Sequence, residues 1–236
     1  IQYFDADLNL ITTWGQPGEF GVAAEPDPID GLWGPRDIAV DAQGRIFISD
    51  TGNKRVRVYQ IVDGQRVHLY DIGEGGSGLG QLDEPAGLAI HPNGNLYVAD
   101  TWNRRISVFT TDGFFLDTFP VRGWYEEQGN RPYLAIDAER ELLYVSDHDA
   151  GRVLVYTTDG DCVGSFGEAA GPEATLGQFT VSAGIAIDSA GQVYVVDNRL
   201  GRVLVFPPFD YTPPVEGVVI PEDVNIIDPE TTVEVF

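Results

Sequence analysis

The stretch Asp50-Thr51-Gly52-Asn53-Lys54-Arg55-Val56 decides the fold, because the chain repeats it fifty residues later as Asp100-Thr101-Trp102-Asn103-Arg104-Arg105-Ile106. In both copies a short apolar run precedes the aspartate, and another apolar run begins at the arginine. The same spacing of aspartate and arginine returns at Asp147–Arg152 and at Asp197–Arg202. Self-similarity of this kind is the signature of a repeat architecture, so it outweighs any single motif.

Each repeat contains short runs of β-branched and aromatic residues that are separated by turn sequences. In the first repeat, Ile38-Ala39-Val40 and Ile46-Phe47-Ile48 flank the turn Asp41-Ala42-Gln43-Gly44, and Asp63-Gly64 provides a second turn. Such a unit predicts a four-stranded antiparallel meander, which is one blade of a β-propeller. No window shows the sustained 3.6-residue periodicity of a helix. We therefore expect an all-β protein.

The N-terminal residues match the second half of a repeat. Tyr3–Gly15 aligns without a gap with Val108–Pro120 and with Val155–Gly167. This alignment predicts that the chain starts on the third strand of a blade.

The C-terminal residues echo the first half of a repeat. Pro221–Ile226 is similar to Pro35–Val40, and we expect Val233–Phe236 to form a second strand. Residues 1–15 and 221–236 are therefore predicted to form one closing blade, as propellers do to remove open sheet edges. The prediction is a single domain over residues 1–236 with five blades, and the alternative is part of a six-bladed ring. The sequence has no methionine, so we expect a processed form or a segment of something longer.

The run Asp50–Val56, preceded by Ile38–Asp41 and Gly44–Ile48, resembles the NHL repeat, and Asp100–Ile106 repeats the likeness. The similarity covers roughly residues 31–206. The resemblance implies a β-propeller, most often with six blades. Members of that family include ligand sensors on bacterial surface proteins, protein- and RNA-binding modules and a few propeller enzymes. The fold alone therefore does not give the function.

The charge balance restricts the partners. Against 14 basic residues stand 37 acidic ones, for a net charge of −23. A surface of this sign repels phosphate, which disfavours nucleic acids and anionic lipid, and it attracts cations or basic partners. No apolar run approaches the ~20 residues of a membrane span. From the single lysine, the single cysteine and the sensor-type relatives we expect a bacterial protein that works outside the cytoplasm or is secreted.

Catalytic chemistry finds little support. The repeated Asp/Arg pairs are interpreted as ion pairs within each blade that hold a loop. His68, His91 and His148 fall on different parts of the predicted blades, which disfavours a zinc site. There is no Gly-x-Ser-x-Gly motif, and Cys162 has no basic neighbour to activate its thiol.

The resemblance leaves one enzymatic alternative. Propellers of the lyase or lactonase kind hold a metal such as calcium in the central channel. Only Asp37 and Asp223 are candidates for such a cation here, and the neighbouring residues are poor in ligands. We therefore expect no cofactor and no enzymatic activity, with a calcium-dependent propeller enzyme as the alternative.

Three tryptophans indicate a binding face. Trp33, Trp102 and Trp124 fall in loops that follow second or fourth strands, and these loops emerge at the same end of a blade. The long loops are at this end too, and rigid scaffolds carry binding residues on such loops. The alternative is that the tryptophans only pack the loops down. The predicted contact residues are Trp33, Arg36, Trp102, Trp124, Tyr125, Arg131, Tyr133 and His148.

The leading functional hypothesis is a non-catalytic binding or scaffold module that recognises a protein, a peptide or a glycan. A structural subunit of a larger assembly is a further alternative, because such a face is then covered permanently.

Overall fold

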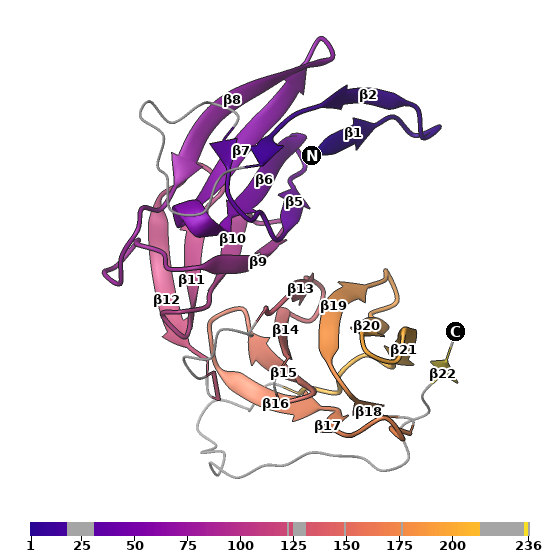
Figure 1. Cartoon of the computed structure of the whole chain (residues 1–236). Coiled ribbons are helices and arrows are strands. Elements are labelled where there is room, and N and C mark those ends of the chain that lie inside the picture. Colours follow the sequence, from indigo (N-terminus) through magenta and orange to yellow (C-terminus); the bar gives the residue numbers. More distant parts are fainter. Residues whose placement is uncertain are drawn as a thin grey trace. The chain divides into compact units, whose positions relative to one another are not determined.

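The computed structural model describes residues 1–17, 31–121, 123–124, 131–148, 150–175, 177–212 and 234–235. The chain divides into two compact units, residues 1–121 and residues 122–236 (Figure 1). Each unit is described by itself below.

The first unit contains two four-stranded antiparallel sheets, which we call the first and second blades. The first blade consists of β5 (Ile38–Val40), β6 (Arg45–Asp50), β7 (Arg55–Val62) and β8 (Gln65–Ile72). The second blade consists of β9 (Pro85–Ile90), β10 (Asn95–Asp100), β11 (Arg105–Thr110) and β12 (Phe115–Pro120). The unit also contains β1 (Gln2–Phe4), β2 (Leu10–Thr13), β3 (Gln16–Pro17), β4 (Gly31–Leu32) and the 3-10 turn η1 (Thr51–Asn53).

The second unit also contains two four-stranded antiparallel sheets, the third and fourth blades. The third blade consists of β13 (Leu134–Asp137), β14 (Leu142–Asp147), β15 (Arg152–Thr157) and β16 (Cys162–Phe166). The fourth blade consists of β19 (Ser182–Ile187), β20 (Val193–Asp197), β21 (Arg202–Phe206) and β22 (Glu234–Val235). Between them lies a short parallel pair, β17 (Glu168–Ala169) and β18 (Gln178–Phe179).

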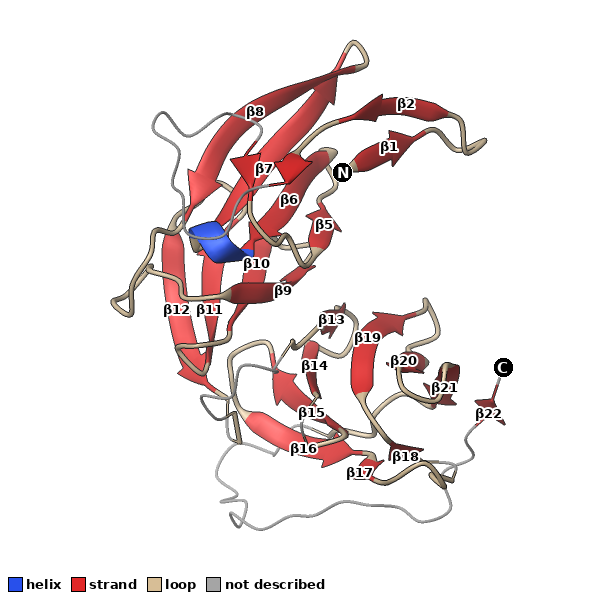
Figure 2. Cartoon of the chain, in the orientation of Figure 1, coloured by secondary structure: helices blue, strands red, loops and turns tan. Residues whose placement is uncertain are grey.

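The predicted all-β class and the β-propeller of four-stranded antiparallel blades are confirmed. Strands make up all regular structure in the described residues except η1 (Figure 2). Among those residues no helix has the length and apolar character that crossing a membrane requires.

Neighbouring blades within each unit share a core. In the first unit β9 lies against β5 and β6, and Phe47, Val58, Leu88 and Phe109 are buried in one cluster. In the second unit β19 lies against β13 and β14, and the corresponding cluster includes Tyr144, Val155, Val195 and Leu204. Burial of these apolar faces is the main stabilising contribution to each pair of blades.

One irregularity supports the predicted alignment of the repeats. In the first three blades the pairing of the third strand with the fourth strand shifts register, at Val58/Tyr59, Val108/Phe109 and Val155/Tyr156. The hairpin of β1 and β2 shows the same shift at Tyr3/Phe4. A β-bulge at one repeat position is a defined feature rather than a defect. The β1–β2 hairpin therefore has the geometry of the outer half of a blade.

The C-terminal strand differs from the expectation. β22 pairs with β21, with Leu204 opposite Val235, so it takes the place of a fourth strand rather than a second strand of a closing blade. A physical reason is the sequence Pro207-Pro208 directly after β21. Proline cannot donate a ladder hydrogen bond, so a tight hairpin does not follow there. Most of residues 221–236, including Asp223, lies outside the described residues, and the closing blade remains a prediction.

Candidate functional site

The aspartate that ends each second strand is buried in all four blades. Asp50, Asp100, Asp147 and Asp197 each face an arginine at the start of the next strand. The distances from the arginine Nε to the carboxylate are 3.0, 2.7, 2.9 and 3.4 Å in the four blades. The interpretation of these pairs as structural ion pairs within a blade is confirmed.

These carboxylates also fix the loops that enter each blade. Asp50 accepts a hydrogen bond from the amide of Trp33 at 2.7 Å, and Asp100 accepts one from the amide of Asp83 at 2.6 Å. In the fourth blade Asp197 accepts one from the amide of Thr180 at 3.2 Å. The loop after a fourth strand is thus held against the loop after the next second strand. Within each unit the two kinds of loop emerge at the same end, as predicted.

The repeat arginine has a second role that the sequence analysis missed. The guanidinium of Arg105 donates to the carbonyls of Ser77, Gly78 and Gln81 at 3.2, 2.8 and 2.8 Å. Arg202 donates at the same sequence offsets, to the carbonyls of Ala174, Thr175 and Gln178 at 3.3, 3.2 and 2.8 Å. The sequence signal is the shared motif Gly-Gln followed by an apolar residue, at 80–82 and 177–179. The two loops that precede β9 and β19 are therefore built to one pattern.

Trp33 and Trp102 lie at two different positions of the repeat, which are joined by a backbone hydrogen bond. Trp33 corresponds to Asp83 of the second repeat, and Trp102 corresponds to Gly52 of the first. The amide of Gly52 donates to the carbonyl of Trp33 at 2.9 Å, and the ring of Trp33 lies so close that a Cβ on Gly52 would meet it at 2.3 Å. In the second blade Trp102 takes the place of Gly52, and its amide donates to the carbonyl of Asp83 at 3.1 Å. Trp33 is half-buried, whereas Trp102 is 51% exposed.

Charged residues of the same loops form two ion pairs. Lys54 Nζ lies 2.8 Å from the Asp83 carboxylate, and Arg36 Nη2 lies 3.8 Å from the Glu84 carboxylate. Burial raises the pKa of Glu84, with the Arg36 charge acting in the opposite direction. We call this group the tryptophan surface, and it consists of Trp33, Arg36, Lys54, Asp83, Glu84 and Trp102.

The backbone of Glu84 is unusual. Glu84 has φ of 52°, and the corresponding residue of the first repeat is Gly34, with φ of 58°. The left-handed region favours glycine, and side chains held there cluster at functional sites. A carboxylate thus stands where the first repeat places no side chain.

The remaining predicted contacts belong to the second unit, so the tryptophan surface is defined without them. Trp124 is 3% exposed, so for this residue the alternative applies, that the tryptophan packs its loop down. Burial of the large apolar area of an indole is favourable where neighbouring residues can cover it. Arg131 is exposed, and Tyr133 and His148 are half-buried. Tyr125 lies outside the described residues.

Asp37 connects the two blades of the first unit by hydrogen bonds. Its carboxylate accepts hydrogen bonds from the amides of Ile38 at 2.9 Å and Leu88 at 2.8 Å, and burial raises its pKa. Leu88 lies on β9, so the contact joins β5 to the second blade. In the described part of the chain no three His, Cys, Asp or Glu side chains are grouped as a metal site would require. A cation at Asp37 stays a prediction.

Known proteins resemble this chain in repeat and in fold. The NHL repeat model matches residues 32–59 and 82–109. No curated protein sequence matches significantly. Among solved structures, virginiamycin B lyase from Staphylococcus aureus is 13% identical, with a TM-score of 0.56 over 100% of this chain and 61% of that protein. The structure of U3-55K is 17% identical, with a TM-score of 0.57 over 86% and 51%.

A third similar structure is hydrazine synthase from Kuenenia stuttgartiensis, 15% identical, with a TM-score of 0.53 over 73% of this chain and 45% of that one. The chain thus spans about three fifths or less of the length of these structures. At such low identity the likeness concerns the fold alone. The chain is therefore a β-propeller that carries NHL repeats at residues 32–59 and 82–109.

Proposed function

We propose that this propeller is a non-catalytic binding module that recognises a basic peptide segment of a partner protein through the tryptophan surface. The observation that carries the proposal is Trp102, a large aromatic residue that is 51% exposed and whose backbone amide is hydrogen-bonded to the carbonyl of Asp83.

The position of Trp102 supports recognition rather than packing. The corresponding residue of the first repeat is Gly52, which supports the same loop without any side chain. The frame of the repeat therefore does not need an indole at this position. Exposed aromatic residues on a rigid scaffold are frequent energetic centres of protein interfaces.

The net charge of the protein favours a cationic ligand group, whereas the surface itself is balanced, because Asp83 and Glu84 are paired with Lys54 and Arg36. Asp83 and Glu84 lie side by side in the chain, and Trp102 is hydrogen-bonded to the backbone of Asp83. A guanidinium that stacks on an indole while it faces a carboxylate gains both a cation–π contact and an ion pair. The net charge of −23 adds a long-range attraction for basic partners. This combination favours an arginine-containing peptide over a neutral glycan.

The first test measures binding of a fluorescein-labelled peptide of alternating arginine and glycine, followed by fluorescence anisotropy. Trp102→Ala should weaken binding at least about tenfold, because it removes the stacking face. Glu84→Gln should weaken binding less, because it removes one charge and keeps the shape. A peptide with aspartate in place of arginine should not bind.

Matched variants separate the site from the overall charge. Phe114→Ala removes an aromatic ring that is more exposed than Trp102, in the turn at the opposite end of the same blade. Asp63→Asn removes one charge in the β7–β8 turn. Both controls should bind as the unsubstituted protein does. Equal affinities of the Trp102→Ala and Phe114→Ala variants would refute the assignment of the surface.

A location outside the cytoplasm, a bacterial origin and the calcium-dependent alternative remain predictions. Metal analysis of the purified protein distinguishes the last of these, since an enzyme of that kind holds a stoichiometric cation.

A further inference from the structure

Lys54 is the only lysine of the chain, and its position in the repeat does not require a side chain. It follows the turn η1 with φ of 57°, and the corresponding residues of the third and fourth repeats are Gly151 and Gly201, with φ of 57° and 60°. Arg104 of the second repeat has φ of 55°. The left-handed region favours glycine, so a long side chain held there is an addition to the repeat frame.

The side chain of Lys54 crosses from the first blade to the loop that precedes β9. Its stem lies against Gly75, because a Cβ on that glycine would stand 3.2 Å from Lys54 Cδ. Its ammonium lies 2.8 Å from Asp83 Oδ1, with 40% of the lysine side chain and 23% of the aspartate side chain exposed. This contact lacks hydrogen-bond geometry, and the buried Oδ1 has no hydrogen-bond partner in the described part of the chain. Lys54 thus covers an acceptor that it does not satisfy.

The Asp83 carboxylate belongs to a residue whose backbone is fixed on both sides. Its amide donates to the Asp100 carboxylate at 2.6 Å, and its carbonyl accepts from the amide of Trp102 at 3.1 Å. Lys54, in contrast, has a flexible stem, and a partly exposed ion pair contributes little to stability. A guanidinium offers a planar pair of donors that matches a carboxylate better than an ammonium does. Exchange of one cation for the other is therefore favourable.

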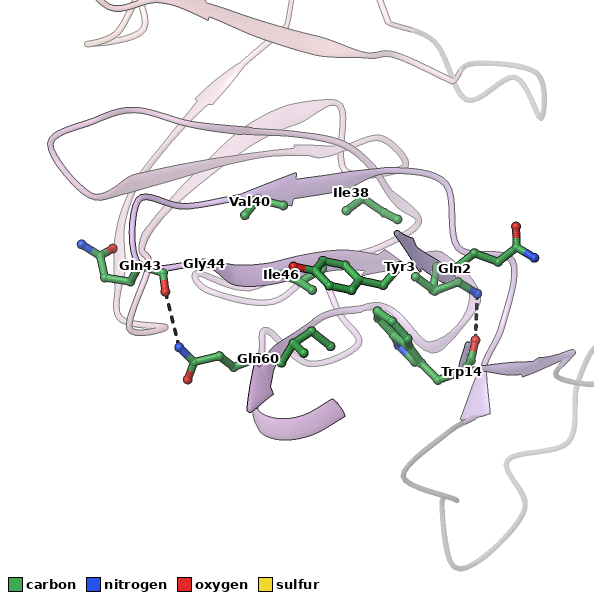
Figure 3. A pocket seen from close by; sticks show the side chains of 11 residues that line it. Gln2, Tyr3, Trp14, Ile38, Val40, Gln43, Gly44, Ile46 and Gln60 are labelled. Carbon is green, nitrogen blue, oxygen red and sulfur yellow. Dashed lines mark hydrogen bonds between the residues drawn. The ribbon is translucent and has the colours of Figure 1, made fainter. Parts of the chain in front are cut away.

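The tryptophan surface differs in kind from the pocket of the first unit. That pocket, of about 280 Å³, is lined by uncharged side chains, among them Tyr3, Trp14 and Ile46, and by no residue of the tryptophan surface (Figure 3). A molecule in such a pocket fills space. A cation that binds at Asp83 instead has to take the place of one that is already there.

We infer that Lys54 is an internal competitor of the ligand: in the free protein its ammonium occupies the Asp83 carboxylate, and an arginine of the bound peptide displaces it. This inference rests on the proposed function, because it concerns the same surface. It accounts for a balanced surface that nevertheless receives a basic peptide. It also makes Lys54 a device that lowers affinity, so that only a peptide able to outcompete the ammonium remains bound.

The first test compares affinities for the fluorescein-labelled arginine–glycine peptide. Lys54→Met keeps the apolar stem and removes the charge, and we expect it to bind the peptide at least about fivefold more tightly, because no cation has to be displaced. Arg199→Met is the matched control: it removes one positive charge from an exposed residue of the second unit. It should change the affinity less than about twofold, because salt screens distant charges.

A double-mutant cycle identifies the carboxylate. Asp83→Asn keeps the backbone contacts of Asp83 and removes its charge. In the unsubstituted protein this change should weaken peptide binding less than about twofold, because the ligand loses a carboxylate that it had to share. In the Lys54→Met background the same change should weaken binding at least about fivefold, because there the ligand has the carboxylate to itself.

The reactivity of Lys54 tests the displacement directly. Acetylation of this single lysine is followed by mass spectrometry of the fragment that contains it, with and without a saturating arginine–glycine peptide whose own amine is acetylated. We expect at least about threefold faster acetylation of Lys54 when the peptide is bound, because the displaced amine leaves its ion pair. An ordinary contact residue would be protected instead.

The outcomes separate this inference from the proposed function. Equal affinities of Lys54→Met and Arg199→Met, weaker binding by Lys54→Met, or unchanged or slower acetylation would each overturn the competitor role, while the effect of Trp102→Ala still tests the surface. Binding by Lys54→Met alone, with none by the unsubstituted protein, would support the inference in its strongest form. Absence of binding by both proteins would refute the proposed function and the inference together.

Discussion

The two blades of the first unit are the same frame with different surfaces. Both hold a buried aspartate between an arginine, an asparagine and the amide of the entering loop. Trp33 covers Gly52 in the first blade, whereas Asp83 leaves Trp102 in solvent in the second. Residues that the repeats share build the blade, and residues in which they differ determine what the loop end presents.

The largest expected effect is the loss of the shared frame. Asp100→Ala removes a buried carboxylate and leaves Arg105, Asn103 and the amide of Asp83 without this acceptor. We expect a loss of about 3–5 kcal/mol in the free energy of unfolding, measured by urea denaturation. Asp50→Ala should cost about the same in the first blade. A loss below about 1 kcal/mol in either blade would show that the two frames are not equivalent.

A smaller effect separates the two tryptophan positions. Gly52→Ala places a Cβ 2.3 Å from the ring of Trp33, so the ring has to move, and we expect a loss of about 1–3 kcal/mol in unfolding free energy. Trp102→Ala, at the same position of the second repeat, should change stability by no more than about 0.5 kcal/mol. Thermal unfolding of both variants measures the contrast. It would disappear if the Trp102 ring packed as the Trp33 ring does.

The smallest effect concerns pH and Asp37, which has Gly87 as its counterpart in the second repeat. Burial raises the pKa of Asp37 above its ordinary value of 3.8. The folded protein therefore binds this proton more tightly than the unfolded chain, and the stabilisation by the protonated form is lost as the pH rises through the folded pKa.

The direction of this pH dependence can be measured. The unfolding free energy of the unsubstituted protein, minus that of Asp37→Asn, should fall as the pH rises from about 3 to about 7. Carboxyl chemical shifts should place the titration of Asp37 above 3.8. A titration below 3.8 would mean that the two amide donors outweigh burial.

The blades were predictable because their signals are local. Runs such as Ile46-Phe47-Ile48, the turn Asp41–Gly44 and the spacing of Asp50 and Arg55 lie within one repeat. The fate of the tryptophans was not predictable, because Trp33, Trp102 and Trp124 all follow strand ends and only tertiary packing decides which ring is covered. The pairing of β22 with β21 depends on long-range contacts that no local pattern encodes. Glu84 was not singled out either, because its left-handed backbone conformation is visible only in the structure.

Arg105 and Arg202 each hold a long loop by hydrogen bonds from the guanidinium group, an arrangement that we call a clamp. The clamp affects which amino-acid substitutions the loop tolerates. Each clamp grips three carbonyl oxygens and no side chain of the loop. The carbonyl of any amino acid satisfies the clamp, but Gly73, Gly76 and Gly80 have positive φ and Leu82 is buried, so only exposed positions such as Ser77 and Leu79 are open to change. Ser77 and Leu79 are thus natural places to randomise in a library, and a selected sequence would inherit the anchoring of the loop without having to encode it.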